Sequence, residues 1–143
     1  AHHADLGVAW DGDFDRCFFF DEHGEFIESY YLVGMFAGNF LQQAPGSTIL
    51  LDPRLIWNTL ETVARHGGRA VISKTGHAFI KARMREENAI YGGEMSGHHY
   101  FREFGYCDSG MIPLMLMIHI LGQRQRPLSR YIQQHLQRYP VSG

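Results

Sequence analysis

The sequence predicts an α/β fold, in which a layered domain with a mostly parallel sheet is preceded by a β-hairpin. Three observations lead to this class. The chain opens with two short apolar runs on either side of an acidic turn, which is typical of a hairpin. Short apolar strands then alternate with segments of helical periodicity, the pattern of right-handed crossovers in a parallel sheet. Gly and Pro residues separate these segments and give each one a defined end.

The first strands are short apolar runs bounded by turn residues. They are expected at residues 6–10, 17–20 and 25–27. A helix is expected at 30–43, because apolar residues recur there every three or four positions until Pro45-Gly46 stops the pattern. The run Thr-Ile-Leu-Leu at 48–51 then predicts a short buried strand.

The second half of the chain continues the alternation. A helix is expected at 55–66, with the Gly67-Gly68 pair at its C-terminal cap. The remaining elements are expected in this order: a strand at 69–73, a helix rich in Lys and Arg at 78–87, a strand at 89–91, and two closing helices at 110–121 and 128–139. The residues between the last strand and the closing helices are interpreted as a polar loop.

The ends of the chain predict a piece of a longer polypeptide. The chain starts almost at once in an apolar strand and ends in a linker-like segment at 139–143. We expect residues 1–25 to be the end of one domain and residues 26–143 to form the next, and 143 residues suffice for that arrangement. No function is assigned to His2 or His3.

Composition excludes several classes of protein. The formal net charge is −2, from 13 basic and 15 acidic residues, so the basic excess typical of nucleic-acid-binding proteins is absent. The longest apolar stretch, 111–121, is far shorter than the roughly 20 residues of a membrane-spanning helix. Two cysteines, Cys17 and Cys107, cannot form a disulfide framework, so a reducing, cytoplasmic setting is expected.

The most informative feature is the acidic turn after the first strand. Asp11, Asp13 and Asp15 alternate there and are followed by Arg16. Three carboxylates in a tight turn can converge on one hard cation such as Mg²⁺, which prefers oxygen ligands. Arg16 could hold a phosphate group beside that ion. The turn therefore predicts a metal-binding loop rather than a solvated acidic turn.

Two other interpretations of this turn compete with the metal-binding loop. A calcium-binding EF-hand loop requires Gly at its sixth position and helices on both sides, whereas this turn has Arg16 there and strands on both sides. A phosphatase of the haloacid-dehalogenase type also has Asp-x-Asp after a buried strand, with its first Asp as nucleophile. That alternative, with Asp11 as the nucleophile, stays open.

Three further loops follow predicted strands, where open α/β sheets gather their ligands. The first carries Arg54, the second His77, and the third Glu94, Ser96 and His98. A carboxylate and a hydroxyl two residues apart suit the paired hydroxyls of a sugar, which need both acceptors and donors. Histidines in such a loop can transfer protons near neutral pH. A zinc site at the adjacent histidines 98 and 99 is a weak alternative, because neighbouring side chains usually point apart.

Taken together, three motifs resemble the α-D-phosphohexomutase superfamily, and their order and spacing are most like the bacterial phosphomannomutase/phosphoglucomutase branch. The motifs are DGDFDR at 11–16, KTGH at 74–77 and GEMSGH at 93–98. Members of that family have four domains, and the resemblance implies that this chain is the end of domain 2 followed by domain 3. It implies for domain 3 a three-layer α/β/α unit with a four-stranded mixed sheet.

The resemblance also implies roles for the site residues. Asp11, Asp13 and Asp15 would bind Mg²⁺, with Arg16 near the phosphate. Glu94 and Ser96 would hold hydroxyls of the hexose ring, and His77 and His98 would line the same pocket. Proton transfer with the sugar oxygen would fall to Arg54 or His98, a choice that the resemblance leaves open.

The implied reaction is a reversible move of phosphate between O1 and O6 of mannose or glucose, by way of a phosphoserine and a bisphosphorylated sugar. Phe14 stands where the family often has Gly, which removes no ligand. The family's serine loop and its late phosphate-clamp loop are not found in this sequence. We therefore expect an enzyme as the parent, a fragment inactive by itself, and partners in hexose phosphate and the missing domains 1, 2 and 4. A non-catalytic sugar-phosphate-binding module is the other alternative.

Overall fold

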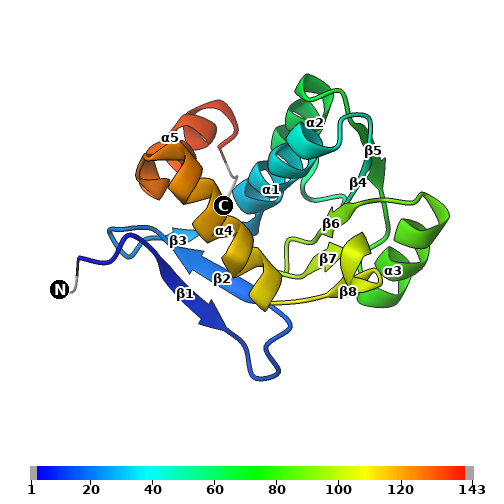
Figure 1. The fold of residues 1–143 in the computed structure, drawn as a ribbon, viewed down its shortest axis with the longest axis horizontal. Helices are drawn as coiled ribbons and strands as arrows, with labels where there is room; N and C mark the ends of the chain where they lie inside the picture. Colours follow the sequence, from blue (N-terminus) through cyan, green and yellow to red (C-terminus); the bar gives the residue numbers. More distant parts are fainter. Residues whose placement is uncertain (1–2, 141–143) are drawn as a thin grey trace.

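A small antiparallel sheet opens the chain (Figure 1). The computed structural model describes residues 3–140, so His2 and residues 141–143 of the linker-like end lie outside the described part. The sheet consists of β1 (Gly7–Trp10), β2 (Cys17–Phe20) and β3 (Phe26–Ile27), in the order β1-β2-β3. Phe19 of β2 is fully buried, whereas every residue of β1 is only partly buried. The predicted hairpin and the short strand expected after it are confirmed, and β3 pairs antiparallel with β2.

The second sheet has five strands rather than the four expected. They are β4 (Thr48–Leu51), β5 (Arg69–Ile72), β6 (Tyr91–Gly93), β7 (His99–Phe101) and β8 (Cys107–Asp108), in the order β5-β4-β6-β7-β8. β4 pairs in parallel with β5 and β6, and the β6–β7 and β7–β8 pairs are antiparallel. The sheet is mixed as expected, but not mostly parallel. β7 and β8 were interpreted as loop, because strands of three and two residues are too short to show a period-two pattern.

Helices cover both faces of this sheet and confirm the three layers. They are α1 (Ser29–Gln43), α2 (Ile56–Arg65) and α3 (His77–Glu86). Side chains of a strand point alternately to opposite faces. Accordingly Ile49 and Leu51 of β4 lie in the main core with α1, and Leu50 packs with Ile80 and Met84 of α3 on the other face. Figure 1 shows α3 on the side of the sheet away from α1 and α2.

The two closing helices connect the small sheet to the main core. They are α4 (Met111–Arg124) and α5 (Leu128–Arg138), and a short 3₁₀ turn, Arg102–Phe104, precedes β8. Met117 and Ile120 of α4 are buried in the same cluster as Phe19 of β2. The two sheets thus share one core through α4 (Figure 1), while the domain division at residues 25 and 26 stays a prediction. Within residues 3–140, no helix is long and apolar enough to cross a membrane.

Candidate active site

The acidic turn forms a tight loop between β1 and β2. Nε of Arg16 lies 2.5 Å from Oδ2 of Asp11, and the Arg16 backbone N–H donates to Oδ1 of the same carboxylate at 3.3 Å. Partial burial would raise the pKa of Asp11, but the hydrogen bonds and charge of Arg16 bring it below its usual value. The same contact raises the pKa of Arg16. Both groups therefore stay charged.

The three carboxylates of this loop are placed to share one cation. Asp11, Asp13 and Asp15 each offer an oxygen, and these oxygens lie within 4.8 Å of one another. Oδ1 of Asp15 is buried and has no hydrogen-bond partner among residues 3–140, since Nε of Arg16 is 3.8 Å away. A buried carboxylate oxygen is costly unless something compensates its charge, and a bound cation would do so. The residues present therefore fit a metal ion.

Backbone strain is concentrated at Phe14, in the middle of the loop. Its φ of +62° is in the left-handed region, which costs a non-glycine residue roughly 1–2 kcal/mol. The residue is 65% exposed, and its ring lies near that of Trp10, at a centroid distance of 6.2 Å. The strained residue therefore gains little packing in return.

Two substitutions at Phe14 measure this strain, because both remove the ring and only one relieves the backbone. We expect the free energy of unfolding of Phe14→Gly to be about 1 kcal/mol higher than that of Phe14→Ala. This is the reverse of the usual order, in which Ala is the more stabilising residue. Urea denaturation of the two variants checks the difference. A Phe14→Ala chain as stable as Phe14→Gly would show that the loop does not hold this conformation in solution.

The acidic loop packs against the start of α4. Nε1 of Trp10 donates to the carbonyl of Gly110 at 2.9 Å. A Cβ on Gly110 would lie 2.5 Å from the carbonyl oxygen of Phe14 and 3.1 Å from that of Arg16, so only glycine allows the approach. The loop therefore rests against the backbone at the N-terminus of α4.

The loop at residues 94–98, between β6 and β7, docks onto the acidic loop. Arg16 and His98 form an antiparallel bridge, and the backbone N–H of Cys17 donates to the carbonyl of Gly97 at 3.4 Å. Nε2 of His98 lies 3.3 Å from Oδ2 of Asp15, and its Nδ1 lies 2.9 Å from Oγ of Ser96. Two motifs about 80 residues apart in the sequence thus lie side by side.

Glu94 joins this loop to the one that carries His77. It is 4% exposed, and its Oε1 accepts a hydrogen bond from the backbone N–H of Gly76 at 2.9 Å. Its Oε2 accepts one from the hydroxyl of Tyr100 at 2.7 Å, and burial followed by this contact raises the pKa of that hydroxyl. His77 itself is the first residue of α3 and is exposed. Tyr100 lies in the missed strand β7 and was not predicted as part of the site.

The loop that carries Arg54 is held by an ion pair between buried Asp52 and the exposed Arg54 side chain. Asp52 is completely buried, and Nε of Arg54 donates to its Oδ1 at 2.9 Å. The backbone N–H of Met95 donates to Oδ2 of Asp52 at 3.3 Å, which ties this loop to the 94–98 loop. Burial would raise the pKa of Asp52, but the hydrogen bonds and charge of Arg54 lower it overall. The pKa of Arg54 is raised in turn, first by its hydrogen bond to Asp52, so Arg54 keeps its proton.

The adjacent histidines 98 and 99 point to different environments. His99 is completely buried in the core, with Nδ1 at 2.7 Å from the hydroxyl of Tyr91. Burial, and then the charge of His98, lower the pKa of His99 to about 3. His99 is therefore a neutral core residue and not a partner of His98 in a metal site.

Comparisons with known proteins agree with this α/β/α architecture and its clustered loops. Residues 28–139 match the family described as phosphoglucomutase/phosphomannomutase, alpha/beta/alpha domain III. The chain belongs to this family.

Proteins similar to this chain are named as phosphomannomutases or phosphohexose mutases. A phosphomannomutase of Escherichia coli is 58% identical over 142 residues, which cover 99% of this chain and 31% of that protein. A protein of Xanthomonas campestris pv. campestris named phosphohexose mutases is also 58% identical, over 99% of this chain and 32% of its own length. A crystal structure of a phosphoglucomutase/phosphomannomutase family protein from Burkholderia thailandensis superposes with a TM-score of 0.84 at 33% identity, covering 91% of this chain and 29% of that one. The chain thus spans about a third of the length of the curated relatives it matches.

Proposed function

We propose that this chain is the metal-loop and sugar-binding part of a phosphohexomutase that interconverts the 1- and 6-phosphates of mannose or glucose. One observation carries the proposal: the acidic loop docks on the 94–98 loop, so that Asp15 contacts His98. Carboxylates suited to a cation are thereby placed beside a carboxylate, a hydroxyl and an imidazole suited to a sugar. Family membership and the names of the relatives support the same activity.

Mg²⁺ is the proposed cation, held by Asp11, Asp13 and Asp15. When bound, it would offset negative charge on the transferring phosphoryl group. Arg16 uses Nε to bind Asp11 and is 41% exposed at its side chain. Its two terminal nitrogens are the groups that would bind phosphate oxygens.

The 94–98 loop is proposed to hold the hexose ring, with His77 at the edge of the same pocket. A carboxylate has about four lone-pair positions. Glu94 uses two for Gly76 and Tyr100, and its Oε2 also lies 3.4 Å from Nδ1 of His98, so a position is left to accept from a sugar hydroxyl. Between the two candidates for proton transfer, we propose His98. Arg54 is unsuited because its ion pair with buried Asp52 keeps it protonated, and its role is to position the loop.

The phosphoserine and the phosphate clamp would come from domains 1 and 4 and from the part of domain 2 that this chain lacks. The partners of the chain are then a hexose phosphate and those domains. The phosphatase alternative, with Asp11 as nucleophile, is not favoured, because Asp11 is bound at both oxygens by Arg16 and the relatives are mutases.

A direct test separates the mutase part from a phosphatase. The chain is incubated with Mg²⁺ and mannose 1-phosphate, and the mixture is followed by phosphorus NMR. We expect no inorganic phosphate, because the chain has no phosphate carrier. Phosphate release that Asp11→Asn abolishes would replace this proposal by the phosphatase.

The sugar-binding role can be tested in a chimera, in which this chain replaces the matching residues of the Escherichia coli phosphomannomutase. We expect Ser96→Ala to raise KM for mannose 1-phosphate about three- to tenfold with kcat changed less than about threefold, as for one lost hydrogen bond of 0.5–1.5 kcal/mol. Steady-state kinetics measures both values.

The control is Ser47→Ala. Ser47 directly precedes β4, at the end of the strand away from the Arg54 loop, so this variant should leave KM and kcat unchanged. A fall in kcat at constant KM for Ser96→Ala would contradict the sugar-binding role. It would show instead that Ser96 acts only by holding His98.

A further inference from the structure

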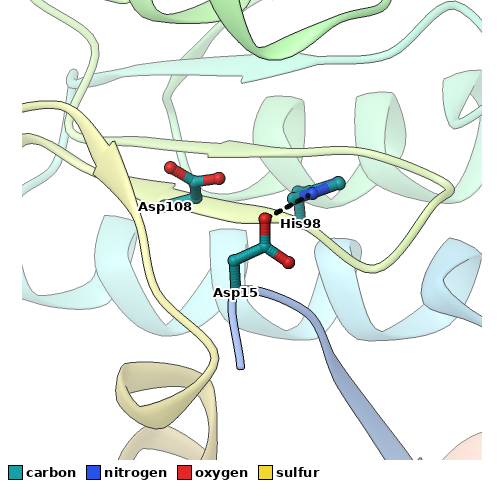
Figure 2. A group of neighbouring side chains, drawn as sticks. All are labelled: Asp15, His98 and Asp108. Carbon is teal, nitrogen blue, oxygen red and sulfur yellow. Dashed lines mark hydrogen bonds and ion pairs between the residues drawn. The ribbon is translucent and has the colours of Figure 1, made fainter. Parts of the chain in front are cut away.

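A second group of possible metal ligands lies beside the acidic loop. Asp15, His98 and Asp108 come from the β1–β2 loop, the β6–β7 loop and β8, and each offers a ligand atom within 4.8 Å of the others (Figure 2). We propose that these three residues bind a second divalent cation, of the kind that accepts a nitrogen ligand, such as Zn²⁺, Mn²⁺ or Co²⁺. This site differs from the proposed Mg²⁺ site in that Asp11 and Asp13 have no part in it and only Asp15 is shared. A cation bound to Nε2 of His98 would compete with the proton transfer proposed above for that residue.

The imidazole of His98 is oriented as a metal ligand would be. Oγ of Ser96 holds Nδ1 at 2.9 Å, which fixes the ring and leaves Nε2 on the side of Asp15. Metal-binding histidines usually have their second ring nitrogen held in this way by a hydrogen bond. Figure 2 shows the ring and the two carboxylates near one another. Nε2 of His98 lies 3.3 Å from Oδ2 of Asp15.

The two carboxylates also have oxygens that a cation can bind, and Asp15 is the residue shared with the Mg²⁺ site. Oδ1 of Asp15 is buried and has no hydrogen-bond partner in the described part of the chain, so it can bind a cation while Oδ2 faces His98. The side chain of Asp108 is 14% exposed, and Nζ of Lys81 binds its Oδ1 at 2.6 Å. A carboxylate can bind through either oxygen, so Asp108 can hold Lys81 and a cation at the same time.

The charges around this group determine which ions it prefers. Lys81 binds Asp108, and Nε of Arg16 lies 3.8 Å from Oδ1 of Asp15, so part of the negative charge of the two aspartates is already offset. A neutral imidazole is a good ligand for zinc and other transition metals but a poor one for Mg²⁺. We therefore expect the site to select Zn²⁺, Mn²⁺ or Co²⁺ over Mg²⁺.

Calorimetric titration of the chain with Zn²⁺ in excess Mg²⁺ tests the proposal, with Co²⁺ absorption and the NMR shifts of the His98 ring as second readouts. Asp108→Asn and His98→Asn should each weaken Zn²⁺ binding at least about tenfold. Asp13→Asn is the matched control, because it removes a ligand of the first site only, and it should leave Zn²⁺ binding within about twofold.

Two results would overturn the proposal. Unchanged Zn²⁺ binding by Asp108→Asn would exclude that residue as a ligand, and an equal loss in Asp13→Asn would place the ion in the first site. Lys81→Met is a further variant that keeps all three ligands and removes the competing ammonium. It should tighten Zn²⁺ binding, and weaker binding in this variant would also contradict the site.

Discussion

Asp13→Asn should reduce the rate at which the chimera converts mannose 1-phosphate by at least about 100-fold and should abolish its dependence on Mg²⁺. The reason is that a metal ion contributes several kcal/mol to stabilising the charge of a transferring phosphoryl group, and each 1.36 kcal/mol is a factor of ten in rate. Asp13 is suited to this test because it is exposed and its substitution leaves the short ion pair between Asp11 and Arg16 in place. Initial rates over a range of Mg²⁺ concentrations measure the effect.

The matched control is Asp5→Asn, the same change at an exposed aspartate before β1. It should leave both the rate and the Mg²⁺ dependence intact. A chimera that turns over equally well in excess chelator would contradict the assignment of Asp11, Asp13 and Asp15 as metal ligands.

Acid should destabilise the chain through His99, which is buried without charge. The folded state holds its pKa at about 3, whereas the unfolded chain has the ordinary value of 6.5. Between these values the unfolded state binds more protons, so the free energy of unfolding falls as the pH drops through this window. One titrating group changes stability by about 1.4 kcal/mol per pH unit, which predicts a loss of about 2 kcal/mol between pH 7 and pH 5.

The variant His99→Asn isolates this contribution, because an amide can still bond to the hydroxyl of Tyr91 but does not titrate. Urea denaturation at pH 7 and pH 5 should show the loss of about 2 kcal/mol in the original chain and little of it in the variant. Equal losses in both chains would mean that His99 titrates normally in the fold.

Most of the fold could be predicted because its elements have strong local patterns. The helix Ser29–Gln43 and the strand Thr48–Leu51 lie within a residue of the expected positions. The helix Met111–Arg124 continues past the apolar stretch that predicted it, to a residue in the left-handed conformation at its C-cap, Gln125. β7 and β8 were missed because they are short and their hydrogen bonds come from partners distant in sequence, which no local pattern reveals.

The candidate site was predictable where its residues form motifs, and only there. The acidic turn and the 93–98 motif are contiguous in sequence, and the structure brings them together through Arg16 and His98. Asp108 and Tyr100 have no motif, because each reaches the site from a strand that the sequence did not reveal. Their places in the site follow from the pairing of β7 with β6 and of β8 with β7.

Conversion of mannose 1-phosphate by the chimera, followed by phosphorus NMR, is the most direct test of the central claim. If this chain is the metal-loop and sugar-binding part of a phosphohexomutase, the chimera will form mannose 6-phosphate and no inorganic phosphate. The parental Escherichia coli protein serves as the reference for the rate. A folded chimera that binds hexose phosphate without converting it would contradict the claim and indicate a non-catalytic binding module, and one that releases phosphate would indicate a phosphatase.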